Sequence, residues 1–202
     1  MRISTSGEEK RDLALAWFAL ALGFTLLLVD LGSVSRGFNA DAFAVTFIAA
    51  FTTAGGGFLL HELAHKVVAQ RYGYWAEFRA DHEMLAVTIA SGALGFLFAA
   101  PGAVQVRGGR IDDRTNGVVA LAGPATNLAL FAFFAPLSIV VTGGLLGYAA
   151  SLGAFVNALL AAFNLVPFGP LDGRKVLAWD RRVYAGAVAV AGAVAAYAFL
   201  VL

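Results

Sequence analysis

Long stretches without a charged residue alternate with short charged segments along the chain. The uncharged stretches are Leu13 to Val29, Ala42 to Leu60, Met84 to Val106, Thr115 to Leu171 and Val183 to Leu202. A helix needs about 20 predominantly apolar residues to cross a bilayer, and each stretch approaches or exceeds that length. The pattern therefore predicts several membrane-spanning helices.

Two of these stretches differ from the length of a single span. Leu13 to Val29 is long for the apolar part of a cleaved signal peptide, so we expect it to remain as the first span. Thr115 to Leu171 is long enough for two crossings, and the turn-forming residues 142–144 lie near its middle. We therefore predict helices near Gly117 to Val141 and near Gly147 to Val166.

Composition agrees with a membrane protein. Of the 202 residues, 60% are hydrophobic and 13% are charged, which is too apolar for an ordinary soluble domain. We predict an all-α membrane protein, a polytopic bundle of five to six transmembrane segments. The lipid bilayer is thus an expected partner, whereas a net charge of +1 gives no reason to expect nucleic acid.

The stretch from Met84 to Val106 is ambiguous because Gly92, Gly95, Pro101 and Gly102 interrupt its helical pattern. If it does not cross, 13 of the 14 Lys and Arg residues share one side of the membrane, and only Arg36 lies opposite. The residues that share a side are Arg2, Lys10, Arg11, Lys66, Arg71, Arg79, Arg107, Arg110, Arg114, Arg174, Lys175, Arg181 and Arg182.

If the same stretch does cross, the split becomes six inside against eight outside, which inverts the positive-inside rule. We therefore interpret Met84 to Val106 as re-entrant, preceded by a short β-hairpin within Tyr74 to Glu83. The protein is then expected to be a multi-pass protein of the cell membrane, with its N-terminus and the loops near the site on the cytoplasmic side.

Candidate metal ligands stand at one end of the second stretch. The chain has no cysteine, so His, Asp and Glu are the expected ligands of a tightly bound metal. His61-Glu62-Leu63-Ala64-His65 is an H-E-x-x-H pattern, which places both histidines on one face of a helix. Glu62 stands where a general base would act on a metal-bound water. The alternative is a set of idle, solvated residues at a helix end, but ionisable residues beside a long apolar run are usually functional.

A catalytic zinc normally has three protein ligands, so a third ligand is needed. The candidates are Asp81, His82, Glu83 and Asp172. Asp81 to Glu83 also fits a solvated turn or part of a substrate approach. Asp172 follows a Pro- and Gly-rich break after an apolar helix, and two crossings between His65 and Asp172 bring both to the same face of the membrane.

Three sequence elements together resemble the site-2 protease family of intramembrane zinc metalloproteases. They are the H-E-x-x-H pattern at His61, a G-P-x-x-N element at Gly123 to Asn127, and an N-x-x-P-x-x-x-x-D-G element at Asn164 to Gly173. The resemblance implies one catalytic Zn²⁺ held by His61, His65 and Asp172, with Glu62 activating water. It places Asn127 and Asn164 near the site, where they position substrate or stabilise the scissile carbonyl, or serve only as packing amides between helices.

The resemblance implies a zinc metalloendopeptidase that cuts transmembrane protein substrates, in a single transmembrane peptidase domain of residues 1–202 with its core at 42–182. A homo-oligomer is left open. Three alternatives remain at this point. One is a membrane metal-binding or transport protein, which has no need of a general base at Glu62; the others are a prenyl-protein-type membrane metalloprotease and a catalytically inactive relative that binds partners.

Overall fold

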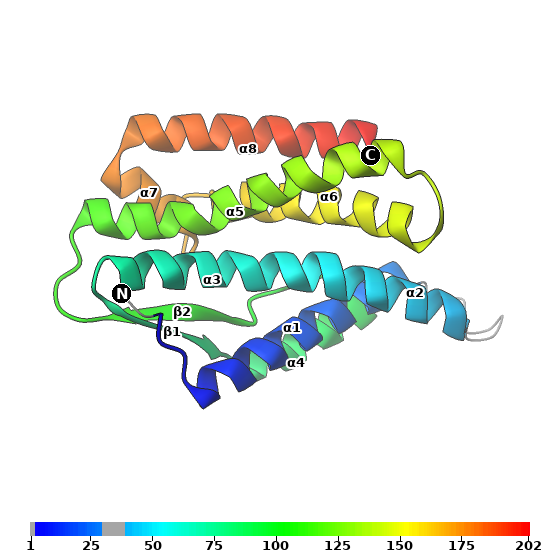
Figure 1. The fold of residues 1–202 in the computed structure, drawn as a ribbon, viewed down its shortest axis with the longest axis horizontal. Helices are drawn as coiled ribbons and strands as arrows, with labels where there is room; N and C mark the ends of the chain where they lie inside the picture. The colour runs from blue at the N-terminus through cyan, green and yellow to red at the C-terminus, as the bar shows by residue number, and fades with distance from the viewer. Residues whose placement is uncertain (1–2, 30–38) are drawn as a thin grey trace.

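The computed structural model describes residues 3–29 and 39–202. Within these ranges the chain is a helical bundle with one small sheet at its edge (Figure 1). The elements are, in order, α1 (Gly7–Leu28), α2 (Ala40–Ala50), the π-helical turn η2 (Phe51–Gly55), α3 (Gly56–Arg71), β1 (Trp75–Ala80), α4 (His82–Ala93), β2 (Gly102–Arg107), α5 (Asp113–Val140), α6 (Gly144–Asn164), α7 (Asp172–Trp179) and α8 (Arg181–Val201).

In the described residues, five helices are long and apolar enough to cross a membrane. They are Gly7–Leu28, the continuous run Ala40–Arg71, Asp113–Val140, Gly144–Asn164 and Arg181–Val201. These bounds confirm the predicted polytopic helical bundle, including the division of the longest apolar stretch into two helices. The turn between those two helices falls at the predicted glycines, where Gly144 has a φ of +64° that only glycine adopts readily.

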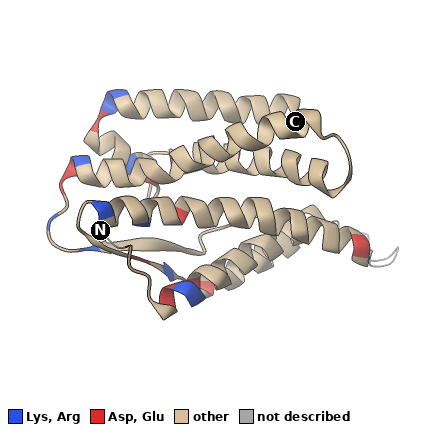
Figure 2. Cartoon of the chain, in the orientation of Figure 1, with Lys and Arg blue, Asp and Glu red and all other residues tan. Residues whose placement is uncertain are grey.

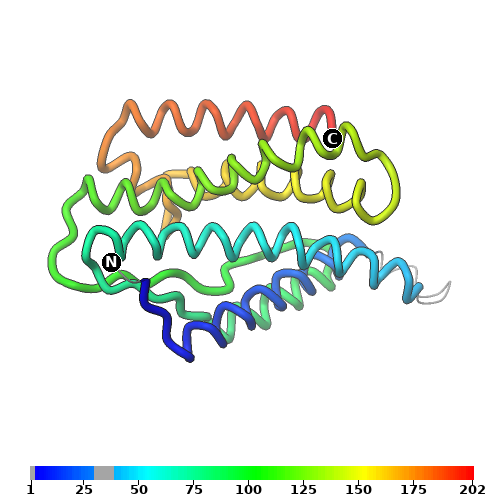
Figure 3. Tube along the Cα trace, in the orientation of Figure 1, coloured from blue at the N-terminus to red at the C-terminus, as the bar shows by residue number. Residues whose placement is uncertain are grey.

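The segment from Met84 to Val106 does not form a span. It contributes most of α4, which at 12 residues is about 18 Å long and too short for a hydrocarbon core of about 30 Å. Ala80 at the end of β1 pairs with Gly102 at the start of β2, so the chain leaves the sheet and returns to the same end (Figure 3). The segment therefore re-enters rather than crosses, as the charge distribution predicts.

Helix α4 lies alongside the membrane span α1. The two helices approach closely at a pair of glycines, because a Cβ on Gly92 would lie 2.2 Å from the Gly23 carbonyl oxygen. The glycines that weaken the helical pattern in the sequence thus serve the packing of α4 against α1.

The sheet is a two-stranded antiparallel pair. A short β-hairpin was predicted within Tyr74 to Glu83, and that segment supplies β1 alone. Its partner β2 comes from the far side of α4, with Phe78 opposite Val104. Local sequence indicates the first strand through its mixed aromatic and charged residues, but the second strand lies inside an apolar stretch that reads as a continuation of α4.

Helix α1 closes the outer edge of β1 with side chains. The Glu9 carboxylate accepts from the Phe78 N–H at 3.0 Å, and the Asp12 carboxylate accepts from the Ala80 N–H at 3.2 Å. Glu9 also forms an ion pair with Lys66 of α3, and both side chains are fully buried. One helix thus fixes the sheet relative to the helix that carries the H-E-x-x-H pattern.

Charged residues gather at one end of the bundle. Figure 2 shows the Lys and Arg of the described residues in the left half of the view, where α3 ends, where α1, α5, α7 and α8 begin, and along the sheet. This agrees with the predicted segregation of basic residues. Arg36, predicted to lie opposite, falls outside the described residues.

Candidate metal centre

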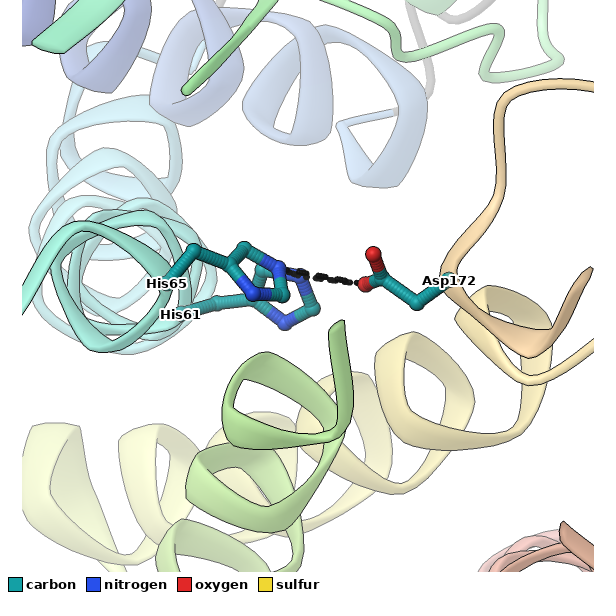
Figure 4. Close-up of side chains that lie close together, drawn as sticks. All are labelled: His61, His65 and Asp172. Atoms are coloured by element: carbon teal, nitrogen blue, oxygen red, sulfur yellow. Dashed lines mark hydrogen bonds and ion pairs between the residues drawn. The ribbon is translucent and has the colours of Figure 1, made fainter. Parts of the chain in front are cut away.

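Two helices bring three ligand residues together. His61 and His65 project from the same face of α3 toward Asp172, the first residue of α7 (Figure 4). The Nε2 atoms of the two histidines are 2.9 Å apart, and they lie 3.4 Å and 3.1 Å from the Asp172 Oδ2 atom. All three side chains are buried, and they form a group that could hold a metal ion. Of the four candidates for third ligand, the structure therefore places Asp172 beside the histidines.

Hydrogen bonds on the far side of each imidazole fix which nitrogen faces the group. His65 Nδ1 donates to the carbonyl oxygen of Val119 at 2.7 Å, and His61 Nδ1 donates to the Asn127 Oδ1 atom at 2.5 Å. Both Nδ1 atoms therefore carry a proton, and the Nε2 atoms are the ring nitrogens that face the Asp172 carboxylate.

Two imidazole Nε2 atoms and one carboxylate oxygen face one another here, and this donor set suits a cation that replaces the protons of the histidines. Zinc bonds of about 2.0–2.1 Å in tetrahedral geometry require donor separations of roughly 3.3 Å. The separations here, 2.9 to 3.4 Å, match that requirement. Two imidazoles and one carboxylate are also a common ligand set of catalytic zinc, which keeps its fourth position for water.

Asp172 reaches the group because its neighbour is a glycine. A Cβ on Gly173 would lie 2.1 Å from the carbonyl oxygen of Leu165, so only glycine lets α7 begin against the end of α6. Burial raises the pKa of the Asp172 carboxyl. The positive charge of His65 in its protonated form, the hydrogen bonds from His61 and His65, and the charge of Lys175 outweigh burial and hold this pKa below its usual range. The carboxylate is thus ionised at neutral pH and available as a ligand.

The G-P-x-x-N element packs directly against the histidines. A Cβ on Gly123 would lie 2.5 Å from the Nε2 atoms of both His61 and His65, so α5 can pass this close only at a glycine. One turn later, Asn127 meets the Nδ1 atom of His61. The four-residue spacing from Gly123 to Asn127 therefore places two features on the same face of α5. One is the space left by the missing Cβ of Gly123, and the other is the hydrogen-bond acceptor of Asn127.

Glu62 points from α3 toward the sheet. It is 7% exposed, and its Oε2 atom accepts a hydrogen bond from the Val104 N–H at 3.0 Å. The carboxylate thus lies between His61 and His65 of its own helix and the outer edge of β2. This is the position that a base acting on water beside the metal needs.

The remaining predicted residues lie outside the metal-binding group. Asn164 donates to the Leu160 carbonyl of its own helix at 2.9 Å. Asp81 caps α4 by accepting from the N–H groups of Glu83 and Met84, which fits the interpretation of Asp81 to Glu83 as a solvated turn. The same residues line an open cleft that also borders Gln105 of β2 and Pro170, two residues before Asp172.

Comparison with known proteins finds relatives that are named zinc metalloproteases. The chain is 40% identical over 162 residues to the protein named Putative zinc metalloprotease MJ0611 of Methanocaldococcus jannaschii, covering 79% of this chain and 85% of that protein. The chain belongs to the site-2 protease family of zinc metalloproteases. No protein-family model and no solved structure matches it.

The chain covers less than half the length of two further relatives. The protein named Putative zinc metalloprotease Rip3 of Mycobacterium tuberculosis is 38% identical over 135 residues, 61% of this chain and 30% of Rip3. Zinc metalloprotease MJ0392 of M. jannaschii is 29% identical over 162 residues, 78% of this chain and 40% of that protein. The function of this chain is accordingly that of a zinc metalloprotease in a multi-pass membrane protein, with Zn²⁺ as its cofactor.

Sequence reasoning missed two groups that contact the predicted site residues of this site-2 protease. One is the Val104 N–H, which bonds Glu62, and the other is Asn157 of α6, which bonds Asn127. The Val104 N–H could not be found from the sequence, because every residue except proline has a backbone N–H. An asparagine within the apolar sequence of α6 is a signal, since a buried amide needs a hydrogen-bond partner.

Proposed function

We propose that His61, His65 and Asp172 hold one catalytic zinc ion, and that Glu62 acts as general base in the hydrolysis of peptide bonds in transmembrane protein substrates. The convergence of three buried ligand atoms from α3 and α7 within hydrogen-bonding distance of one another carries this proposal. Membership of the site-2 protease family supports it.

Each residue has a separate task in the reaction. When bound, zinc supplies a Lewis acid that acidifies a water and polarises a carbonyl oxygen. Glu62 takes a proton from the attacking water and later delivers it to the leaving amine nitrogen. The hydrogen bond from Val104 keeps the Glu62 carboxylate turned toward the β2 side of α3, where a peptide can approach.

The position of the site within a span favours substrates that lie in the bilayer. His61 and His65 belong to the 32-residue run Ala40–Arg71, so they are part of a helix long and apolar enough to cross. A substrate helix satisfies its backbone internally and needs local unwinding before a peptide bond is accessible. The basic end of the bundle supports placing the N-terminus and the sheet on the cytoplasmic side of the cell membrane.

An unwound substrate needs partners for its backbone, and the outer edge of β2 offers them. The register and the Val104 bond direct the N–H of Val104, and by alternation those of Gly102 and Val106, away from β1. A substrate segment that adds to this edge as a strand lies against Glu62. The open cleft beside Gln105 and His82 provides its approach.

The test compares the wild type with Glu62→Gln, Asp172→Ala and the control His82→Ala in detergent, measuring bound zinc and cleavage of a single-span substrate. Glu62→Gln is expected to retain zinc and lose at least about 100-fold in turnover, as removal of a general base does. Asp172→Ala is expected to lose both zinc and cleavage. His82→Ala is the control for zinc binding and is expected to retain zinc, because His82 lies outside the metal-binding group.

The outcomes separate the alternatives. Cleavage that survives Glu62→Gln would contradict the mechanism, and zinc binding without any cleavage in the wild type would favour a metal carrier or an inactive relative. A soluble peptide with the same cleavage sequence is the second control. If it is cut as fast as the single-span substrate in liposomes, preference for membrane-embedded substrates is excluded.

A further inference from the structure

We propose that Asn157 of α6 is a positioning residue for the metal centre, acting on His61 through Asn127. The inference rests on the proposed role of His61 as a zinc ligand. Asn157 lies outside the three sequence elements that indicate the family, between the G-P-x-x-N element and Asn164.

A chain of hydrogen bonds joins α6 to the His61 ring. Asn157 Nδ2 donates to the Gly153 carbonyl oxygen at 2.8 Å, and Asn157 Oδ1 accepts from Asn127 Nδ2 at 2.8 Å. Asn127 Oδ1 then accepts from His61 Nδ1 at 2.5 Å. Three side chains on three helices are thus joined in series.

The carbonyl oxygen of Gly153 determines which group donates in each of these hydrogen bonds. A backbone carbonyl only accepts, so Asn157 presents its NH₂ group to Gly153 and its oxygen to Asn127. Asn127 in turn presents its NH₂ group to Asn157 and its oxygen to His61. The proton of His61 is therefore held on Nδ1, which keeps the Nε2 lone pair directed at the group formed with His65 and Asp172.

The packing of the helices makes room for this amide. Asn127 and Asn157 are both 0% exposed. A Cβ on Gly57 of α3 would lie 2.5 Å from the Asn157 Oδ1 atom, so α6 brings this side chain against α3 where glycine permits it. An apolar side chain could fill the position of Asn157 without the free-energy cost of burying a polar group. The hydrogen bond to Asn127 explains why an amide side chain lies there.

The experiment measures zinc affinity of the full-length protein in detergent by competition with a chromophoric chelator. Asn157→Leu is expected to weaken zinc binding about 10-fold, in the range found when groups that orient ligands are removed. Asn157→Asp keeps an acceptor oxygen for Asn127 and is expected to stay within about threefold of wild type on the same scale. Thr25→Val removes a buried hydroxyl that donates to the Ala21 carbonyl oxygen of its own helix α1. It controls for the loss of a buried hydrogen bond and is expected to bind zinc as the wild type does.

A double-mutant cycle separates positioning from general packing. Since Asn157 acts through Asn127, Asn157→Leu is expected to cost no further affinity in an Asn127→Leu background. Full additivity, wild-type affinity in Asn157→Leu, or an equal loss in Asn157→Asp would each overturn the proposal.

His61→Ala is measured in parallel. Loss of zinc in His61→Ala with normal affinity in Asn157→Leu rejects the role of Asn157 alone. Retention of zinc in His61→Ala rejects the proposed metal centre itself.

Discussion

The two edges of the sheet have opposite surroundings. On β1, side chains satisfy the outward backbone groups: Glu9 and Asp12 accept from Phe78 and Ala80, and Gln70 donates to the Ala76 carbonyl. On β2, the outward N–H of Val104 bonds to Glu62, the proposed base. One edge is thus closed by α1 and α3, and the other faces the metal centre.

This difference indicates where a substrate strand can add. An exposed strand edge is a template for pairing with any extended chain, and proteins usually cover edges that are not used. Here the covered edge is the one that faces α1. We infer that closing β1 directs an extended substrate to β2, beside Glu62, and that the two edges can be tested separately.

The largest effect is expected from removing the charge of Glu9, which pairs with Lys66 beside the closed edge. Glu9→Gln leaves Lys66, which is 1% exposed, without its counter-charge. Removing one partner of a buried ion pair costs about 3–5 kcal/mol, so the free energy of unfolding should fall by that amount. Unfolding in mixed micelles by denaturing detergent measures it.

The matched control for Glu9 is the double variant Glu9→Gln with Lys66→Met. It removes both charges and is expected to recover most of the lost stability, because replacing a buried pair by uncharged groups is often neutral. If Glu9→Gln alone lowers the unfolding free energy by less than about 1 kcal/mol, the pair does not hold α1 against the sheet and α3.

The next largest effect is expected at the other edge. Val104→Pro removes the N–H that Glu62 accepts but breaks no ladder bond, because this N–H points away from β1. A hydrogen bond to a charged group is worth about 1.5–3 kcal/mol, so kcat/KM for a single-span substrate should fall about 10- to 100-fold. Zinc content should stay at the wild-type level.

Val104→Ala is the control for this edge because it shortens the side chain and keeps the N–H. It is expected to cleave within about threefold of wild type, as for a change that spares the hydrogen bond. Equal losses in Val104→Ala and Val104→Pro would assign the effect to packing of the side chain, and no loss in Val104→Pro would reject the role of the Val104 N–H in orienting Glu62.

Sequence predicts one part of this site well. His61, Glu62 and His65 are neighbours on one helix, so the H-E-x-x-H spacing alone defines their relative positions. Asp172 is also accessible to sequence reasoning, because counting membrane crossings brings it to the same side as His65. The spans follow from apolar length, which the bilayer makes a strict requirement.

The features whose role the sequence did not explain depend on contacts between segments that are distant in the chain. Gly123 and Gly173 matter because their missing Cβ atoms let α5 and α7 approach the histidines and Leu165. Strand β2 is stabilised by pairing with β1. Its residues continue the apolar stretch after α4, so the spacing of apolar residues does not distinguish a strand from more helix. Each of these features depends on which two segments lie side by side. One sequence on its own does not show which segments pack together.

The smallest effect is expected from Asp12, the second residue that closes β1. Asp12→Ala leaves the Ala80 N–H without its acceptor at the end of the strand, where the bond is 3.2 Å long and only part-buried. We expect a loss of about 1 kcal/mol in the free energy of unfolding and unchanged cleavage, since this edge does not face Glu62. The measurement is unfolding by denaturing detergent beside cleavage of the single-span substrate. A variant that keeps its stability but cleaves more slowly would show that substrate pairing involves the β1 edge as well, and the assignment of separate roles to the two edges would fail.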